Sequence, residues 1–310
     1  MTQTHARAVR FDRYGDRDVL YVTDIPMPTS GPDEVLLEVK AAGINPGEAS
    51  IRKGLLHDRF PATSLPWPDG NVAGVVLGVG AAVTDFAVGD EVLGYSWTRS
   101  THATHAVVPA SQLIPKPAGL SWEVAGGLYV VACTAWAAVR AVDPKIGETV
   151  AVSAAAGGVG TVVTQLLRVR GAHVVGIASP ASADWLRGHG ATPVSYGTDL
   201  RREVRAAAAD GVDAFIDLFG PEYLDLATDL GVAPERIETI ISWAQAQRIG
   251  AHSAGSVDGS SKQVLAEMAD LVVSGRIDIP IAAVFSLTSV RDAFAELEQR
   301  HTRGKIVLVP

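Results

Sequence analysis

A glycine-rich turn at residues 156–160 has the residue types and spacing best suited to chemistry. It reads Ala156-Gly157-Gly158-Val159-Gly160 and joins an apolar run of Val and Ala to an amphipathic helical pattern. Glycine lets the backbone turn sharply and lets a phosphate approach with no Cβ in the way. A helix that begins there directs unpaired N–H groups and the positive end of its dipole at that anion. The turn therefore predicts a pyrophosphate-binding βα unit of the dinucleotide-binding type.

Alternating strand and helix patterns surround this turn. Ser121-Trp122-Glu123 can cap and open an apolar helix, and residues 133–142 read as a second helix. Further strands are predicted at residues 150–154, 173–178, 193–195, 214–218, 237–242 and 248–253, with helices at 159–170, 183–189, 200–208 and 222–231. Such alternation predicts an α/β fold with a parallel sheet covered by helices on both faces.

The first part of the chain has the pattern of antiparallel β structure. Val35, Leu37 and Val39 alternate with more polar neighbours, as in a half-exposed strand. Short strands bounded by Gly and Pro are predicted at residues 6–11, 19–24, 34–42, 72–79 and 91–95. A helix (262–274), a strand (281–285), a helix (289–301) and a strand (305–309) close the chain. We expect an α/β domain at residues 118–261, inserted into a β domain made of residues 1–117 and 262–310.

Size and composition indicate a globular protein and narrow its partners. The chain has 310 residues, of which 47% are hydrophobic and 19% charged, which suits a well-buried fold of two domains. Its net charge of −8 argues against a general nucleic-acid or anionic-membrane surface. One cysteine, Cys133, excludes an internal disulfide. With no signal-peptide pattern and no uninterrupted apolar run of membrane-spanning length, a cytoplasmic location is expected.

Several motifs in order give the whole chain a family resemblance. They are VRFDRYGDRDVL (9–20), GINPGEASIRKG (43–54), DGNVAGVVLGVGAAVTDFAVGDEVLG (69–94), HAVVPASQLIPKPAGLSWEVAG (105–126), the glycine turn, and RGKIVLVP (303–310). Together they resemble the medium-chain dehydrogenase/reductase superfamily, and within it the zinc-free, zeta-crystallin-like quinone oxidoreductase branch. The resemblance implies a Rossmann doubly wound parallel sheet inserted into a GroES-like antiparallel β domain.

The residues at the family's zinc positions predict a chain without metal. Asn45 stands where zinc-dependent members carry a Cys, and Asp69-Gly70-Asn71 replaces their Gly-His-Glu. One thiol cannot build a closed zinc site. His102 and His105 lie three residues apart, but with no matching carboxylate or thiol nearby a chance pair is the simpler interpretation.

The cofactor expected from the resemblance is NADPH. The second Rossmann strand ends without the acidic residue that NAD(H) enzymes use for the ribose hydroxyls, so a 2′-phosphate is permitted. Ser179 can donate to that phosphate, and Tyr196 matches a tyrosine that contacts it in this branch. Relatives add a Lys or Arg just after the serine, whereas this chain has Ala181 and Ala183. The predicted cofactor contacts are Asn45, Thr134, Ala156, Gly157, Gly158, Val159, Ser179, Tyr196, Leu218, Phe219, Ser242 and Trp243, with Asn45 and Thr134 flanking the nicotinamide.

The group that assists the reaction is less evident from the sequence. Without zinc, hydrogen-bond donors must stabilise the oxygen that becomes negative when hydride adds to a quinone or an α,β-unsaturated carbonyl. Ser50 occupies the place of a tyrosine in several relatives. Asn45, Ser50 and Tyr95 are therefore the catalytic candidates, with Trp97 in the same region. We expect a cleft between the domains, walled by residues 47–56, 59–67 and 95–101, in which Phe60 and Trp67 would contact a small apolar or aromatic carbonyl substrate.

Two other functions remain open from the sequence. One is an enoyl reductase of a biosynthetic pathway, acting on a carrier- or CoA-bound chain. The other is a non-catalytic NADPH-binding or sensing protein. The resemblance also implies a homodimer that pairs the last Rossmann strand across a two-fold axis, with residues 248–253 as the candidate edge.

Overall fold

A computed structural model describes residues 4–58, 70–97 and 101–310 of the chain, which forms two compact units. The first unit consists of Met1–Val130, Ser261–Val273 and Ile281–Pro310, and the second of Val131–Ser260 and Ser274–Pro280. The second unit is thus inserted into the first. The units divide after Val130 rather than at residue 117, because the first turns of a long helix pack on strands of the first unit.

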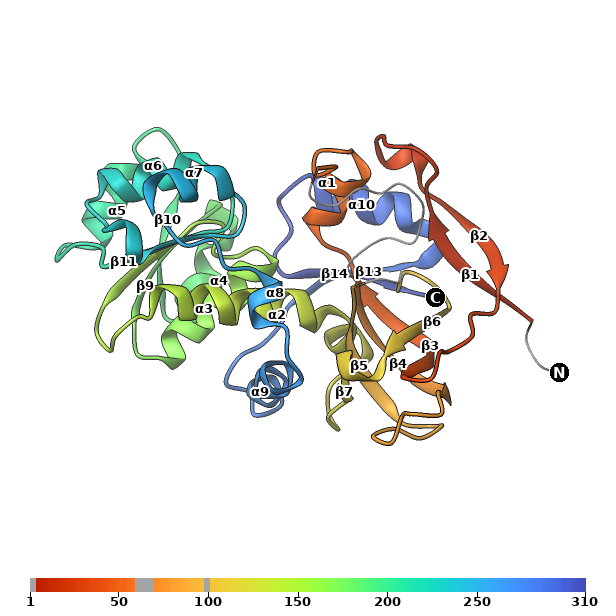
Figure 1. Ribbon diagram of the computed structural model, residues 1–310. Helices are drawn as coiled ribbons and strands as arrows, with labels where there is room; N and C mark the ends of the chain where they lie inside the picture. Colours follow the sequence, from red (N-terminus) through yellow and green to blue (C-terminus); the bar gives the residue numbers. More distant parts are fainter. Residues whose placement is uncertain (1–3, 59–69, 98–100) are drawn as a thin grey trace. The chain divides into compact units, whose positions relative to one another are not determined.

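The first unit is built on a seven-stranded sheet and a separate hairpin of β1 and β2 (Figure 1). The main sheet has the order β13-β14-β3-β4-β5-β7, with β6 also paired to β3. Its strands and those of the hairpin are β1 (His5–Arg10), β2 (Tyr21–Pro26), β3 (Glu34–Gly43), β4 (Gly70–Val79), β5 (Glu91–Ser96), β6 (His105–Pro109), β7 (Leu113–Pro115), β13 (Ile281–Ser286) and β14 (Lys305–Val309). Its helices are α1 (Pro46–Arg52), α9 (Lys262–Val273) and α10 (Val290–Glu298).

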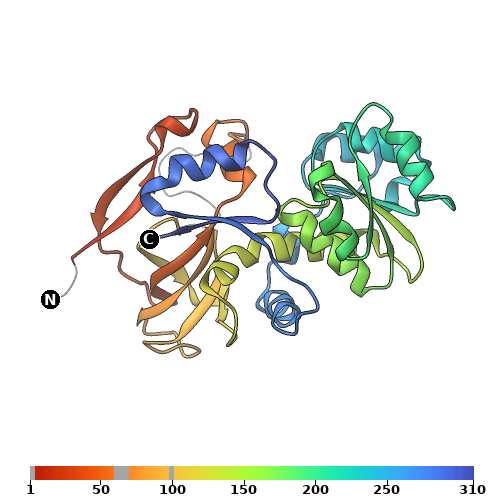
Figure 2. The ribbon, with the colours of Figure 1, turned by 180° about the vertical axis from the view of Figure 1, so that it is seen from behind.

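Strand β3 carries the alternation predicted from the sequence. Val35, Leu37 and Val39 are buried, and the residues between them are partly exposed. The inward side chains pack with β4 and β6 residues into one apolar core. At its end β3 pairs antiparallel with β14, where Gly43 faces Val307. The C-terminal strand therefore lies beside a strand from the start of the chain, as both views show (Figures 1 and 2).

Helix α1, directly after β3, was not predicted from the sequence. Asn45 is its N-cap and Pro46 its first residue, a position where the missing proline N–H costs nothing. Glu48 at the third position completes a capping box with Asn45. Arg52 at the other end is fully buried and forms an ion pair with Glu298 of α10 (2.5 Å). These contacts hold a seven-residue helix that has little apolar periodicity of its own.

Helix α2 (Trp122–Val142) is one continuous helix, not the two predicted. Gly126 and Gly127 lie within this helix without ending it. Their lack of a side chain lets the helix approach β3 closely, since a Cβ on Gly126 would meet the Ala41 carbonyl oxygen at 2.5 Å. By length and composition α2 could cross a membrane, contrary to the expectation of no such apolar segment, but 72% of its most apolar window is buried within the molecule. That burial is typical of the core helix of a globular protein.

The second unit contains a five-stranded parallel sheet with the order β10-β9-β8-β11-β12. This is the predicted Rossmann sheet, with the order reversing direction at β8. Its strands are β8 (Thr149–Val152), β9 (His173–Ala178), β10 (Ala191–Ser195), β11 (Ala214–Asp217) and β12 (Ile237–Thr239). Its helices are α3 (Gly158–Val169), α4 (Ala183–Gly188), α5 (Leu200–Ala207), α6 (Glu222–Asp229), α7 (Trp243–Ile249) and α8 (Ser256–Gly259).

The core of this sheet follows the strand alternation. Phe215 and Ile237 pair in register and point to the same apolar cluster, which Val204 of α5, Leu224 of α6 and Ala246 of α7 complete. The next residue along each strand must point to the opposite face of the sheet. Helices thus cover both faces of the sheet, as expected for parallel strands with long apolar runs.

The strand predicted at residues 248–253 is wrong over most of its length. Arg248 and Ile249 end helix α7, and Gly250 closes that helix in the left-handed conformation (φ 80°). Only His252 bridges to Glu238 of β12, as an isolated parallel pair. The helix is favoured because Ala246 reaches the apolar cluster, a tertiary contact that the local pattern does not contain.

Candidate functional site

The glycine turn has the geometry expected for an anion site. After β8 the chain passes through Ala154, whose φ of 46° is unusual for a residue with a side chain. The Gly157 N–H then donates to the Ala154 carbonyl (2.8 Å), and Gly157 is the N-cap of α3. A Cβ on Gly160 would overlap that same carbonyl, so only glycine fits there. The turn is tight because the end of β8, the Ala154 carbonyl and the start of α3 are packed against one another.

Helix α3 is twelve residues long, so its first turn presents several N–H groups without partners inside the helix. Ala156, Gly157, Gly158 and Val159 lie at this start, as predicted. The buried face of the helix, with Val162, Val163 and Leu167, holds it against the sheet. A pyrophosphate placed at this end would accept hydrogen bonds from these N–H groups and be stabilised by the helix dipole.

Asp217 joins three strand ends of the Rossmann sheet and was not predicted from the sequence. Its Oδ1 accepts hydrogen bonds from Ser153 Oγ (2.7 Å) after β8, and its Oδ2 accepts one from Thr239 Oγ1 (2.7 Å) on β12. Burial raises the pKa of this carboxyl, and the hydrogen bonds to it offset part of that rise. The signal in the sequence was an acidic residue at the last position of a buried strand.

This carboxylate positions the loops after β11 and β12, which carry the predicted cofactor contacts Leu218, Phe219 and Ser242. The N–H groups of Phe219 and Gly220 donate to Asp217 Oδ1 (2.9 and 3.1 Å), and the Leu218 N–H donates to Ser153 Oγ. On the next strand, the Ser242 N–H donates to Thr239 Oγ1 (3.1 Å). Leu218, Phe219 and Ser242 are thus held by one buried polar network.

Ser242 supplies an observation that fits a bound cofactor. Its Oγ is buried and has no hydrogen-bond partner among the described residues. A buried hydroxyl without a partner is costly, and a polar ligand would relieve that cost. Trp243, which follows it, is the first residue of α7. The glycine turn and this hydroxyl together show that the second unit has the parts to hold a dinucleotide.

Ser179 and Tyr196 are brought to the same edge of the sheet. Ser179 directly follows β9 and Tyr196 directly follows β10, the neighbouring strand, and the Tyr196 N–H donates to the Ala178 carbonyl (3.3 Å). Tyr196 is 49% exposed, and Ser179 Oγ lies 3.3 Å from Ser182 Oγ. Arg187, the nearest arginine in the following helix, forms a surface ion pair with Asp184 (2.7 Å).

Thr134 and Cys133 lie inside α2, so Thr134 is not at a helix start as predicted. Thr134 is 5% exposed. Cys133 is fully buried, and burial raises the pKa of its thiol to about 12. A thiol with so high a pKa is almost never ionised at neutral pH and is a poor nucleophile. Cys133 is therefore a buried structural cysteine rather than a nucleophile.

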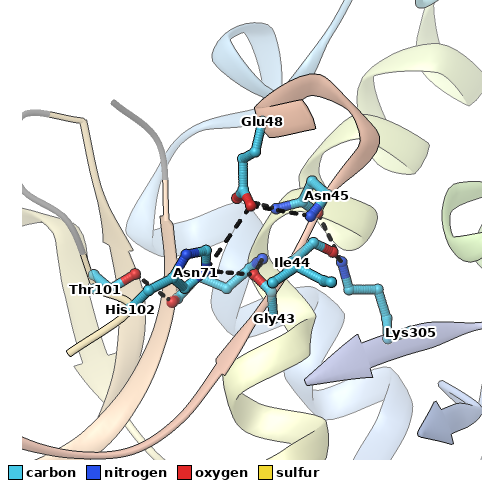
Figure 3. Close-up of polar contacts among 8 residues, drawn as sticks. All are labelled: Gly43, Ile44, Asn45, Glu48, Asn71, Thr101, His102 and Lys305. Atoms are coloured by element: carbon cyan, nitrogen blue, oxygen red, sulfur yellow. Dashed lines mark hydrogen bonds and ion pairs between the residues drawn. The ribbon is translucent and has the colours of Figure 1, made fainter. Parts of the chain in front are cut away.

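In the first unit, Asn45 lies in a buried network of charged and polar side chains (Figure 3). Lys305 Nζ donates to Asn45 Oδ1 (2.7 Å) and to the Ile44 carbonyl (2.7 Å). Asn45 Nδ2 in turn donates to Glu48 Oε1 (2.9 Å), and the Asn45 N–H bonds Glu48 Oε2 (3.3 Å). Lys305, Asn45 and Glu48 are 3%, 8% and 2% exposed.

His102 and Asn71 extend this network on its other side. His102 Nε2 donates to the Gly43 carbonyl (3.4 Å), which also accepts from Asn71 Nδ2 (3.1 Å). His102 Nε2 lies 3.9 Å from Glu48 Oε2. The pKa of His102 is lowered to about 4, mainly by burial and also by the nearby Lys305 charge, while the hydrogen bond to the Gly43 carbonyl offsets part of this, so the imidazole is neutral at neutral pH. The sequence did not indicate Glu48, His102 or Lys305 as parts of the site.

The other two catalytic candidates lie outside this network. Tyr95 is 6% exposed and stacks on Tyr129 (ring centroids 3.9 Å apart), with Trp97 edge-on to both rings. Ser50 Oγ donates to the carbonyl of Pro46 in its own helix (3.3 Å). The predicted cleft walls at Phe60 and Trp67 lie outside the described residues.

The donors around Asn45 do not fit a zinc ion. An ammonium group 2.7 Å from Asn45 Oδ1 would repel a dication at that oxygen. Within residues 4–58, 70–97 and 101–310, no group of three or more His, Cys, Asp or Glu side chains could hold a metal. Zinc in proteins needs such N, S or carboxylate ligands.

Known protein families match both parts of the chain. Residues 31–139 match the alcohol dehydrogenase GroES-like domain, and residues 189–308 match the family described as zinc-binding dehydrogenase. Along the chain the GroES-like match precedes the dehydrogenase match, just as the β-rich first part of the chain precedes the parallel sheet. The chain belongs to the medium-chain dehydrogenase/reductase superfamily.

Individual relatives of this superfamily place the chain in its quinone oxidoreductase-like branch. The quinone oxidoreductase of Pseudomonas aeruginosa is 28% identical and aligns over 98% of this chain and 100% of its own length. The mitochondrial NAD(P)H oxidoreductase RTN4IP1 of Bos taurus is 29% identical over 96% of this chain and 87% of its own length. The solved quinone oxidoreductase of Coxiella burnetii has a TM-score of 0.87 at 26% identity, covering 99% of both chains. The chain is an oxidoreductase of the NAD(P)-binding dehydrogenase type.

Proposed function

We propose that this oxidoreductase uses NADPH to reduce a quinone or an α,β-unsaturated carbonyl compound, without zinc. The observation that carries the proposal is the contact of the Lys305 ammonium with Asn45, at the position of a family zinc ligand. A cationic side chain there takes the place of a metal, so a hydrogen-bond donor must assist the substrate. The likeness to quinone oxidoreductases over nearly the full chain supports the substrate class.

The preference for NADPH rests on the carboxyl ends of β9 and β10. Residues 179–183, Ser-Pro-Ala-Ser-Ala, contain no carboxylate to repel a 2′-phosphate. The Ser179 hydroxyl and the half-exposed Tyr196 follow neighbouring strands there. Both can donate hydrogen bonds to phosphate oxygens. Arg187 is engaged with Asp184 at the surface and is not needed for this assignment.

Residues of the chain would bind and orient the cofactor and assist the reaction. The glycine turn and the start of α3 would hold the pyrophosphate, and the loops fixed by Asp217 would support the rest of the cofactor. Bound NADPH supplies the hydride. Asn45 Nδ2 would donate a hydrogen bond to the substrate oxygen as negative charge develops on it, and a proton from water would complete the reduction.

We extend the proposal to partners and location. The substrate is a small apolar or aromatic carbonyl compound, with no nucleic acid and no membrane as partner. The protein is proposed to be a cytoplasmic homodimer. Its single cysteine, buried and with a raised thiol pKa, is compatible with a reducing compartment.

Two measurements test the proposed function. Fluorescence titration with NADPH and NADH should show tighter binding of NADPH, and tighter binding of NADH would overturn the cofactor assignment. NADPH oxidation should then be followed with a panel of quinones, enones and enoyl thioesters. Turnover of quinones or enones is expected. Turnover of thioesters alone would identify an enoyl reductase, and tight NADPH binding without any turnover would identify a sensing protein.

A further inference from the structure

The network in Figure 3 determines how the side-chain amide of Asn45 is oriented. Lys305 Nζ has only hydrogens to donate, so the Asn45 atom 2.7 Å from it must be the oxygen. The Glu48 carboxylate only accepts, so the Asn45 atom 2.9 Å from it must be the nitrogen. A flipped amide would place nitrogen against ammonium and oxygen against carboxylate. The two contacts therefore agree on a single orientation.

That orientation leaves Asn45 with a hydrogen to donate. Its Nδ2 carries two hydrogens, of which Glu48 accepts one. Among the described residues the other has no acceptor. The ammonium at Oδ1 draws electrons from the amide, which makes each N–H a stronger donor. Asn45 is 8% exposed, more than either charged neighbour, so it is the least covered residue of the three.

Burying the charged groups of Lys305 and Glu48 costs free energy, and this cost indicates a role other than stabilising the fold. Lys305 and Glu48 are both nearly fully buried, and Asn45 forms a hydrogen bond with each of them. Burying two charges stabilises a fold less than apolar packing of the same volume would. A lysine that only joined β14 to the end of β3 would need neither Asn45 nor a charge, since backbone pairing already does this.

We propose that Lys305 is a positioning residue of the reaction, acting through Asn45. It holds the amide oxygen, so that the remaining Nδ2–H points outward as the donor to the substrate oxygen, and it strengthens that donor by its charge. Glu48 fixes the other end of the amide and balances the charge. This inference rests on the proposed function and adds to it the group that replaces zinc and the residue that prepares it.

The first test uses kinetics of Lys305→Met, Asn45→Ala and the double variant, with NADPH and a quinone that the wild type reduces. Lys305→Met keeps the chain length and removes the charge. It should lower kcat by about 10- to 100-fold, as loss of a transition-state donor does, with KM changed less than about threefold. The double variant should be no slower than Asn45→Ala, because Lys305 acts through that residue.

The partly exposed Lys40 of β3, paired with Glu38, offers a matched control. Lys40→Met should leave kcat unchanged. If Lys305→Met keeps the wild-type kcat, or if its loss adds fully to that of Asn45→Ala, the inference is wrong. A wild-type protein that turns over no quinone or enone would instead overturn the proposed function, so the two failures are distinguishable.

The second test needs no turnover. Asparagine occurs only at positions 45 and 71, so selective ¹⁵N-asparagine labelling gives two side-chain amides in an NMR spectrum. Asn71 donates to the Gly43 carbonyl and accepts from the Val130 N–H, without contacting Lys305, and is an internal reference. Lys305→Met should shift the Asn45 amide and leave that of Asn71 in place.

If the methionine variant does not fold, Lys305→Gln keeps a neutral donor at the same place. It should preserve the orientation of Asn45 and recover part of kcat. Unshifted Asn45 signals in either folded variant would contradict the inference.

Discussion

At the scale of single residues, Glu238 of β12 is a buried acid whose role differs from that of Asp217. Its side chain is 0% exposed, and neither carboxylate oxygen has a hydrogen-bond partner among the described residues. Its pKa is raised from 4.5 to about 8, mainly by burial and also by the carboxylates of Asp258 and Asp217, while the Ala254 N–H, outside hydrogen-bonding geometry, offsets part of the rise. Asp217, by contrast, accepts four hydrogen bonds.

The stability of the protein should therefore depend on the protonation of Glu238. The folded state holds the proton up to about pH 8 and the unfolded chain releases it near 4.5, so stability is full below pH 4.5 and falls as the pH rises toward 8. Glu238→Gln imitates the protonated form. It should raise the free energy of unfolding at pH 8 by roughly 1–3 kcal/mol and flatten the loss between pH 5 and 8. Urea unfolding at several pH values measures this.

The exposed Glu235 gives the control for that comparison. Glu235→Gln should leave the pH dependence of the urea midpoint as it is in the wild type. A Glu238→Gln variant that is less stable than the wild type at pH 8 would show that the carboxylate has a partner in solution.

At the scale of elements, the join between β8 and α3 depends on two unusual backbone positions. A Cβ on Gly160 would overlap the Ala154 carbonyl oxygen, so there is no room for a side chain at this position. Ala154 itself is held at a positive φ of 46°. The first position tolerates only glycine, whereas the second carries an alanine that glycine would suit better.

Substitutions at these two positions should have opposite effects. Gly160→Ala pushes α3 away from the strand, because the obstacle is backbone that cannot rotate aside. It should cost about 1–3 kcal/mol of stability and weaken NADPH binding more than tenfold. Ala154→Gly should be neutral or stabilise by up to about 1 kcal/mol, since the positive φ is no longer strained. Urea midpoints and NADPH titrations compare the two, and unchanged binding in Gly160→Ala would contradict the proposed pyrophosphate site.

At the scale of the whole molecule, we propose that two copies associate through the edge of the Rossmann sheet. His252 bridges to Glu238 of β12, with hydrogen bonds to Ile237 and Thr239. Because neighbouring residues of a strand direct their backbone groups to opposite sides, Ser253 presents its N–H away from β12. Ser253 is exposed. This short edge can pair with the same edge of a second copy.

We therefore expect a solution mass of twice the 32.4 kDa chain by sedimentation. Ser253→Pro removes an outward N–H from the edge and should shift the protein toward monomer, with NADPH binding retained. Arg187→Ala, in a surface ion pair of α4, is the control and should remain dimeric. A wild-type monomer at micromolar concentration would refute pairing at this edge.

Much of the fold follows from local patterns. The alternation in β3, the apolar runs of β8 and β9, and the glycine turn before α3 repeat over a few residues, so they can be recognised without knowing the rest of the chain. Helices α1 and α7 were not predicted because neither has a long apolar stripe. A capping box stabilises α1, and one buried alanine stabilises α7.

The sequence by itself determined the family, the two-part α/β architecture and the place of the cofactor turn, because these depend on short motifs and on the order of elements. Only the tertiary structure brought Lys305 to Asn45, across 260 residues, and joined Asp217 to Ser153 and Thr239. Those contacts arise from strand pairing: β14 lies beside the end of β3, and β11 lies between β8 and β12. Which side chains face one another across paired strands depends on register, and no local pattern in this chain reveals it.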